Sequence, residues 1–529
     1  MSDRRAMLIL IGAWLAIAAA VGAGPEIALD DSWNYAQMTE HLLERGALRF
    51  SHYDSALVVL HVLWGALVTA VTGFSLSHVV VANLLAALLA LVAGYFLARQ
   101  FDLSPEAALW VTAATGATPP FFVLAYTYMA DFWFLIPAWL SLAFMARFLR
   151  RGKELDAAFA GLFAAAAFWN RLHAVLLVAA FVVFLLWQQR RLTLRARTAF
   201  YVVGLPAVSW LALHWATPAL QPVRTTFSRK SSEVWTRLLS PDVLALDSLE
   251  RLAIVLLSIG AYALPVVLML AARRASNGRG PAMWAGAAAA VAAAGAALWL
   301  TGEAFPFDSS VLREQPPATA AWFVMPWTLA ALAGAAGWLF LLIRRREAEG
   351  APLLDRFLVV AMIVLIAALL PLVYFMDRYF LVFVPLVMIL AVRRAGPWSE
   401  TPRWAKVAAG VVLALFVASG AMRVTHYRAG IAAQWNAADR LVTQGVSSLE
   451  IDGGYSWTGW RNFAVCREHR GENNTTSLDT HYVVEICPMM KTRFDVVFHE
   501  MDPPRRLVSK DDWHNFLGDE DTVYVYQRP

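Results

Sequence analysis

The sequence predicts an α-helical polytopic membrane protein with about 13 transmembrane helices, juxtamembrane helices at the outer face and a small C-terminal α/β domain outside. Of its 529 residues, 59% are hydrophobic and 16% are charged, whereas a soluble chain has about 25% charged residues. Mean hydropathy is +0.54, and apolar runs long enough to cross a bilayer recur along the chain. Because these runs are continuous and do not alternate, the sequence excludes a membrane β-barrel as well as a soluble enzyme.

The orientation depends on one apolar run, 56–73. If it crosses the membrane, the basic clusters at 147–153 and 344–346 face outward, against the positive-inside rule. The run is barely long enough to span and contains His61, so we expect it to lie at the outer face. The N terminus is then cytoplasmic and the C terminus is periplasmic or extracellular, in an inner (plasma) membrane. The predicted spans are about 7–24, 77–98, 105–124, 132–149, 157–170, 174–187, 199–217, 251–272, 282–301, 320–343, 356–376, 379–392 and 405–422.

The polarity of the chain changes near residue 422, which predicts a membrane domain, 1–422, and an extracytoplasmic α/β domain, 423–529. The tail contains the only two cysteines, Cys466 and Cys487. An oxidising compartment would permit a disulfide between them, and two free thiols are the alternative. The elements expected in the tail are a helix at 431–444 and strands at 448–451, 482–486, 494–498 and 522–526.

The first outer loop carries the strongest chemical signal. Asp30 and Asp31 precede an amphipathic segment in which Tyr35 follows Asp31 by one helical turn and Gly46 ends the helix. A carboxylate at this interface can take a proton from an acceptor hydroxyl, as a general base does. Alternatively, Asp30 or Asp31 caps the helix N terminus, and the two roles are compatible.

Two more ionisable residues are expected within the membrane boundary. Asp131 lies at the outer end of a span among apolar and aromatic residues, where a carboxylate is costly unless it is paired or used; a helix cap is the alternative. Arg171 lies between apolar halves, 157–169 and 174–187, each covering about 20 Å of a core about 30 Å thick. It therefore needs an anion, either a lipid-linked phosphate or a carboxylate such as Asp131, unless it snorkels to the headgroups.

Arg378 and Tyr379 stand between two later spans. A guanidinium binds phosphate oxygens in bidentate fashion, so Arg378 is a second candidate phosphate ligand. A local ion pair with Asp377 is the alternative. Weaker candidates are His52, Tyr53 and Arg313. The alternative for each is an ordinary solvated loop residue.

Several function classes are excluded by what the sequence lacks. It has no GxxxxGK phosphate loop, no HExxH and no GxSxG motif, which argues against nucleotide-driven transport and zinc proteolysis. The net charge of +5 comes from short loops beside helices, so we expect no nucleic-acid partner. The composition, rich in Ala and Arg, indicates a bacterial source.

Together these features resemble the GT-C class of integral-membrane glycosyltransferases, in the branch of the lipid A aminoarabinose transferases and the protein O-mannosyltransferases. The branch has an Asp-x-x-x-Tyr-Ala motif in the first outer loop, which runs here from Asp31 to Ala36. The departures are Asp30 beside Asp31 where relatives more often have Asp-Glu, and the absence of Gly after Arg171. The remaining matches are the non-spanning run 56–73, Asp131, Arg171 and the pair Arg378-Tyr379.

The resemblance implies inverting transfer of a sugar from a polyprenyl-phosphate donor to a lipid, glycan or protein acceptor at the outer face of the bilayer. Asp31 would be the general base, Asp30 its substitute, and Asp131 would orient a substrate. Arg171 and Arg378 would stabilise the leaving phosphate, and Tyr35, His52, Tyr53, Arg313 and Tyr379 would contact substrates. No cofactor is expected; a divalent metal is possible but not favoured, because the carboxylates are separated.

Two other functions remain open at this stage. A transporter or lipid flippase would favour repeated halves and ionisable groups at mid-membrane, whereas the acidic residues here cluster on one face. A non-catalytic assembly subunit would tolerate Asp31→Asn and Asp131→Asn without loss of function.

Overall fold

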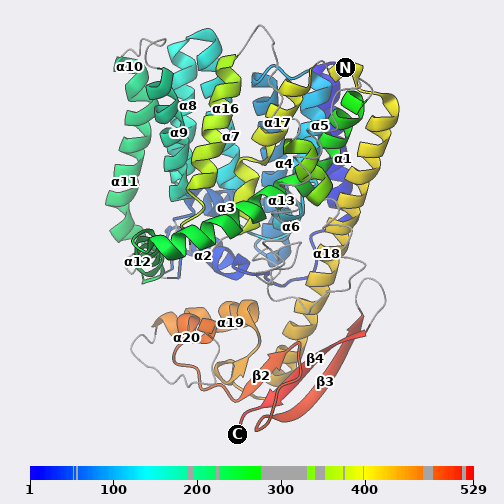
Figure 1. The fold of residues 1–529 in the computed structure, drawn as a ribbon. Helices are drawn as coiled ribbons and strands as arrows, with labels where there is room; N and C mark the ends of the chain where they lie inside the picture. Colours follow the sequence, from blue (N-terminus) through cyan, green and yellow to red (C-terminus); the bar gives the residue numbers. More distant parts are fainter. Residues whose placement is uncertain are drawn as a thin grey trace.

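The computed structural model describes residues 1–51, 53–54, 57–188, 196–221, 225–275, 331–339, 352–372, 376–396, 398–468, 481–514 and 520–529. A bundle of helices forms the larger part, and a small domain with a β-sheet lies beyond one end of it (Figure 1). The N terminus is at the opposite end of the bundle from this tail domain. The helices of the bundle, with α18 continuing into the tail, are α1 (Asp3–Val21), α2 (Ser32–Arg45), α3 (Val59–Thr72), α4 (Leu76–Gln100), α5 (Pro105–Gly116), α6 (Pro119–Ala125), α7 (Phe132–Arg151), α8 (Glu154–Phe168), η1 (Leu172–Ala174), α9 (Val175–Gln188), α10 (Ala196–Ala199), η2 (Phe200–Gly204), α11 (Leu205–Leu220), α12 (Thr225–Leu238), α13 (Pro241–Ala275), α16 (Pro352–Ala367), η4 (Asp377–Val382), α17 (Val384–Ala395), η5 (Trp398–Glu400) and α18 (Arg403–Thr443).

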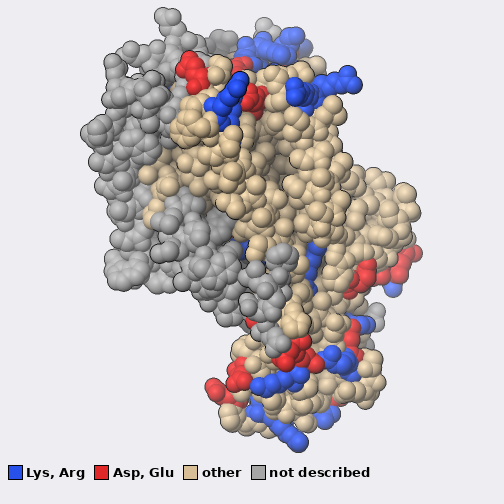
Figure 2. All heavy atoms as spheres, turned by 90° about the vertical axis from the view of Figure 1, so that its right-hand side faces the viewer, with Lys and Arg blue, Asp and Glu red and all other residues tan. Residues whose placement is uncertain are grey.

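The bundle is that of an integral membrane protein. In the described part of the chain, six helical segments are long and apolar enough to cross a bilayer, or seven if the bent pair α5–α6 is one span. The expected spans at 282–301 and over most of 320–343 lie outside the described residues. On the face shown in Figure 2, a broad band of uncharged residues separates the charged end of the bundle from the charged tail, as a hydrocarbon belt requires.

The run 56–73 forms helix α3, which has 14 residues and is therefore about 21 Å long. A core about 30 Å thick needs a longer helix. The length of α3 fits the non-spanning segment that the sequence predicts.

A broken helix leads into the site. α5 and α6 meet at an angle of 69°, where the sequence predicted one straight span. Thr118 has extended backbone and precedes Pro119, because a residue before proline avoids the helical region. Beyond the break, Asn83 donates to the carbonyls of Leu124 and Thr127, at 2.8 and 2.7 Å, and so satisfies backbone oxygens where α6 ends.

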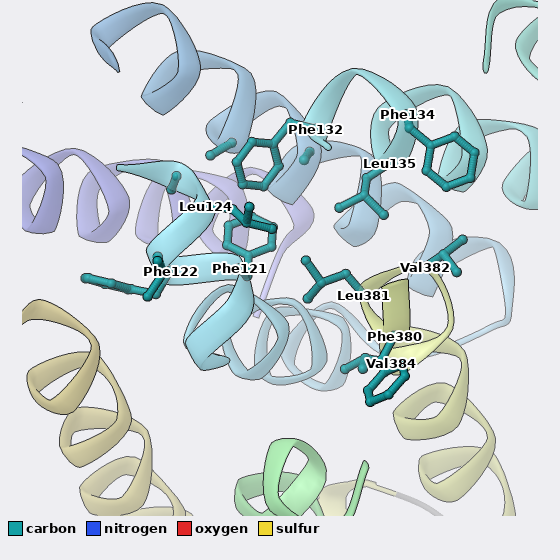
Figure 3. Packing of buried hydrophobic residues seen from close by; sticks show 14 of the residues in the cluster. Phe121, Phe122, Leu124, Phe132, Phe134, Leu135, Phe380, Leu381, Val382 and Val384 are labelled. Atoms are coloured by element: carbon teal, nitrogen blue, oxygen red, sulfur yellow. The ribbon is translucent and has the colours of Figure 1, made fainter. Parts of the chain in front are cut away.

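An apolar core packs behind the break and places three elements together. Phe121 of α6 and Phe132 of α7 have ring centroids 4.8 Å apart, and both are fully buried. Phe380 and Leu381 of η4 lie on the other side of the same cluster (Figure 3). Because these side chains are packed in one buried cluster, Asp131, which immediately precedes α7, and the start of η4 lie on the same side of the bundle.

Helix α18 has 41 residues and joins the bundle to the tail without a break. The sequence predicted a span at 405–422 and a separate helix at 431–444, so the helical content is right and the gap between them is wrong. Residues 423–430 continue the helix because Arg428 is anchored at mid-course: its guanidinium donates to Gly22 O at 2.8 Å and to Tyr126 O at 3.2 Å.

The tail contains a four-stranded sheet in the order β1-β2-β4-β3. The strands at 494–498 and 522–526 are confirmed, but the strand expected at 482–486 is the helix α20, which packs on α19 and ends beside the disulfide between Cys466 and Cys487. β3 was missed because most of its residues are exposed and polar. The tail elements are η6 (Ser448–Glu450), β1 (Ile451–Asp452), α19 (Tyr455–Glu468), α20 (His481–Ile486), β2 (Phe494–Val497), β3 (Arg506–His514) and β4 (Glu520–Gln527).

Candidate active site

The acidic pair stands at the start of α2, which ends at Gly46 as the sequence predicts. Asp31 occupies the N-cap position, but its side chain makes no capping hydrogen bond. Instead, its Oδ1 accepts a hydrogen bond from the hydroxyl of Tyr455. Asp30 has a φ of 50°, a left-handed conformation that aspartate tolerates better than most residues. The cap therefore does not explain the side chain of Asp31.

Helix α2 is fixed from both sides. On the bundle side, Ser32 Oγ accepts from Tyr128 N at 2.9 Å. On the tail side, Gln37 Nε2 donates to Trp460 O at 2.9 Å. The acidic pair is consequently held between the membrane helices and the tail domain.

Tyr455 is a site residue that the sequence reasoning missed. It is the first residue of α19 in the tail, and its hydroxyl oxygen is 2.8 Å from that of Tyr53. The ring of Trp33 packs against both, with centroids 5.7 Å from Tyr53 and 6.1 Å from Tyr455. The only signal in the sequence is the turn Gly453-Gly454 that precedes this aromatic residue, and such a turn does not reveal a contact more than 400 residues away along the chain.

Asp131 and Arg171 form an ion pair within the bundle. Arg171 Nη2 is 2.8 Å from Asp131 Oδ1, and the side chains are 13% and 6% exposed. Asp131 is at the N-cap position of α7 but makes no capping bond, so the cap interpretation is wrong here too. Arg171 has extended backbone before η1. Its neighbour Asn170 donates to Ala130 O at 2.6 Å, which brings the two charged residues together.

Arg378 is buried in η4 and has unused hydrogen-bonding capacity. Its Nε and Nη1 atoms have no hydrogen-bond partner in the described part of the chain, and it forms no ion pair with Asp377 there. The guanidinium groups of Arg378 and Arg171 lie 5.6 and 5.7 Å from the centroid of the Tyr379 ring, within the range of cation–π attraction. Tyr379 thus holds two cationic groups on one aromatic ring.

A small cavity of about 30 Å³ opens onto these groups. Its polar lining consists of Asp131, Arg171, His173, Arg378 and Tyr379, and leucines of α9 and α16 form part of its apolar wall. A space of this size holds about one or two water molecules. An anion with several oxygens would therefore enter only if side chains move, and the ion pair between Asp131 and Arg171 is the contact it would displace.

The acidic pair and the guanidinium groups belong to one electrostatic environment. Loss of water, and after it the Asp31 carboxylate, raise the pKa of Asp30 to about 8 against the opposing charge of Arg378. Burial likewise raises the pKa of Asp54 to about 8, although hydrogen bonds from Ser51 and Asn34 favour its ionised form. Asp30 and Asp54 are therefore largely protonated at neutral pH.

Tyr35 lies between the two groups of charges. Asp31, Asp54, Arg171 and Arg378 all act on its hydroxyl, whose pKa burial raises well above the ordinary value. The structure thus brings together Asp30, Asp31, Tyr35, Tyr53, Asp131, Arg171, Arg378 and Tyr379. His52 and Arg313 lie outside the described residues.

His61 completes the wall of the site without exposing its ring. It is fully buried, its Nε2 is 3.3 Å from Tyr128 O, and its ring is 5.5 Å from that of Tyr35. His61 is therefore a buried, hydrogen-bonded residue of α3.

Comparison with known proteins places this geometry in a known fold. The model of the dolichyl-phosphate-mannose-protein mannosyltransferase family matches residues 54–215. No curated protein sequence matches the chain. The crystal structure of ArnT from Cupriavidus metallidurans bound to undecaprenyl phosphate is similar with a TM-score of 0.50 at 13% sequence identity, over 98% of this chain and 97% of that chain. The apo state of that protein gives 0.40 at 14% identity, over the same shares.

The family-model match and the match to the structure with bound undecaprenyl phosphate confirm the resemblance that the sequence motifs indicated. The chain has an ArnT-like GT-C fold with a small C-terminal sheet. The matched family segment contains Asp131 and Arg171 but neither the acidic pair nor Arg378, so the roles of those residues depend on their own geometry.

The ion pair predicts an asymmetric response to mutation. Asp131→Asn should lower the free energy of unfolding by about 3 kcal/mol, because removing one partner of a buried pair leaves the other charge uncompensated. The melting temperature of the purified protein in detergent measures this. Asp131→Asn combined with Arg171→Gln should recover part of the loss.

The matched control is Glu500→Gln, which breaks the pair between Lys510 and the exposed Glu500 (69% exposed). Surface pairs contribute little to stability, so its melting temperature should stay near that of the parent protein. Equal, small effects of the two substitutions would show that the pair between Asp131 and Arg171 is solvated.

Proposed function

We propose that this protein transfers a sugar from a polyprenyl-phosphate donor to an acceptor hydroxyl at the membrane face that carries the tail domain. The observation that carries the proposal is Arg378, a buried guanidinium with two nitrogens that have no partner among the described residues. It lies beside Arg171 in an apolar-walled cavity close to an acidic pair. A lipid-linked phosphate matches this chemistry, because arginine binds phosphate oxygens through several donors.

The roles of the residues follow from where charge develops in such a transfer. Asp31 accepts the proton of the acceptor hydroxyl while the acceptor oxygen attacks the anomeric carbon of the sugar. The bond between that carbon and the phosphate oxygen breaks, and polyprenyl phosphate leaves with the electron pair. Attack opposite to the leaving group inverts the anomeric configuration. Arg171 and Arg378 stabilise the growing negative charge in a water-poor site, where such interactions are strongest.

Two tyrosines and Asp131 act on these groups. The hydroxyl of Tyr455 fixes the orientation of the Asp31 carboxylate, and Tyr53 supports Tyr455. Asp131 holds Arg171 until the phosphate arrives. The acceptor is a lipid, a glycan or a protein of the cell envelope, and it approaches from the tail side because Asp31 faces Tyr455 of the tail.

The proposed setting is a bacterial inner membrane, with the N terminus cytoplasmic and the tail periplasmic. The basic residues at the N-terminal end of the bundle support this orientation. A cysteine introduced in the tail should react with a membrane-impermeant maleimide added outside spheroplasts, and labelling only after lysis would reverse the orientation.

We propose that the reaction needs no metal ion. Among the described residues, no group of three or more His, Cys, Asp or Glu side chains is placed to hold one, and the two arginines supply the positive charge. Transfer should persist in EDTA, and loss restored by a divalent cation would contradict this.

The general-base assignment predicts that Asp31→Asn lowers kcat by about 10²–10⁴-fold. Release of polyprenyl phosphate from a panel of polyprenyl-phosphate sugars, by the purified protein, measures it. Tyr455→Phe keeps the ring but removes the hydrogen bonds of its hydroxyl to Asp31 and Tyr53, and it should have a smaller effect, about tenfold. Normal turnover by a folded Asp31→Asn variant would reject the assignment.

The phosphate assignment predicts weaker lipid binding by Arg378→Ala. The affinity for sugar-free undecaprenyl phosphate should fall about 10- to 100-fold, because hydrogen bonds to a charged group are lost. Arg378→Lys keeps the charge but loses the paired N–H donors that bind two phosphate oxygens, so its affinity should be intermediate. Arg461→Ala, which breaks an exposed tail ion pair, is the control, and equal affinities of all variants would remove Arg378 from the phosphate site.

The pKa of Asp30 predicts a pH effect on donor binding. Since its pKa is raised to about 8, Asp30 is neutral below that pH and negative above it. Its ionisation adds repulsion toward the phosphate, so the donor KM should rise severalfold between pH 7 and 9. Asp30→Asn should abolish the rise, whereas Asp54→Asn, which removes another carboxyl whose pKa is raised to about 8, should preserve it. A rise that survives in Asp30→Asn would exclude Asp30 as its cause.

A further inference from the structure

A second and larger cavity, of about 1090 Å³, lies among α1, α4 and α7. Its charged end is remote from the candidate active site, although its wall reaches Ile136, five residues after Asp131. Asp131 stands immediately before α7, whereas the cavity reaches Arg150 and Arg151 at the other end of that 20-residue helix, about 30 Å away. The cavity therefore opens at the end of the bundle where the N terminus lies (Figure 1).

The apolar part of this cavity is an open channel along the contact between two packed helices. Leu89, Val92 and Phe96 of α4 line one wall at intervals of three and four residues, so they share a helix face. Ile136 and Phe144 of α7 line the other wall, and the rings of Phe96 and Phe144 are 5.6 Å apart.

The channel is long enough for an acyl chain. Its lining runs along α4 from Leu89 to Arg99 and along α7 from Ile136 to Arg151, which at 1.5 Å per residue is about 15 and 22 Å. Half of a hydrocarbon core about 30 Å thick is about 15 Å. The channel therefore extends from the charged surface at least to mid-membrane, which is the depth that an acyl chain of one leaflet occupies.

The rim of the cavity has excess positive charge. Asp3 is neutralised by Arg99, with Oδ1 2.6 Å from Nε, and Asp102 is bound by Arg150. Arg4 and Arg151 also line the rim and are exposed, and neither has an ion-pair partner within the described ranges. Two guanidinium groups consequently remain to attract an anion.

We propose that this cavity binds an anionic glycerophospholipid of the adjacent leaflet, with its phosphate between Arg4 and Arg151 and an acyl chain in the channel of α4 and α7. A soluble anion would leave the apolar channel unused, and a neutral lipid would leave the two arginines unmatched. The lipid differs from the sugar donor, whose phosphate is assigned to the opposite end of the bundle.

Native mass spectrometry of the full-length, delipidated protein tests the proposal. Phosphatidylglycerol and phosphatidylcholine with identical acyl chains are titrated separately, and the wild type should bind phosphatidylglycerol more tightly. Arg4→Gln combined with Arg151→Gln should weaken that binding about 25-fold, because each basic side chain near a lipid surface contributes roughly fivefold. Phosphatidylcholine binding should change little.

Two further variants separate the cavity from the rest of the membrane surface. Leu89→Trp fills the channel from an exposed position and should weaken phosphatidylglycerol binding without a change of charge. Arg403→Gln, at an exposed arginine outside the cavity, should leave it unchanged. Equal binding of the two lipids by the wild type, or unaltered binding in the double and Leu89→Trp variants, would overturn the proposal. Displacement of phosphatidylglycerol by stoichiometric undecaprenyl phosphate would overturn it in favour of a second polyprenyl site.

Discussion

The ion pair between Asp131 and Arg171 is the constraint on which the site depends. Two opposite charges with little exposure must be paired, because each alone would be costly in apolar surroundings. The pair links the start of α7 to the turn between α8 and η1. Beside this pair, Arg378 has two nitrogens and Arg171 has one without a hydrogen-bond partner in the described residues. A phosphate, the group that we propose for this site, would bind both arginines together.

The acidic side of the site differs from the ion pair because its residues come from two distant parts of the chain. Asp31 comes from the loop after α1, whereas Tyr455 comes from the tail. The aromatic residues Trp33, Tyr53 and Tyr455 pack around this contact. The tail is therefore a wall of the reaction chamber in our proposal, and it restricts which acceptors reach the carboxylate.

The sequence predicted those parts of the fold and site that depend on local pattern. The helix after Asp31, the ends of β2 and β4 and the pairing of Arg171 with an anion follow from periodicity, burial and charge. Tyr455 was not predictable, because only tertiary structure brings α19 to α2. The segment 482–486 is rich in residues that favour strands, yet packing against α19 makes it helical. The bend between α5 and α6 is signalled by Pro119-Pro120, but its angle depends on the packing of Phe121.

The unbroken course of α18 has a consequence for how this chain tolerates insertions and deletions. A helix of 41 residues is a rod about 60 Å long, and each added or removed residue turns everything beyond it by about 100°. One such change between Arg428 and the sheet would rotate Tyr455 away from the Asp31 carboxylate, while the bundle and the tail could each keep their own packing. The number of residues in this segment therefore determines how the tail is rotated relative to the helix bundle.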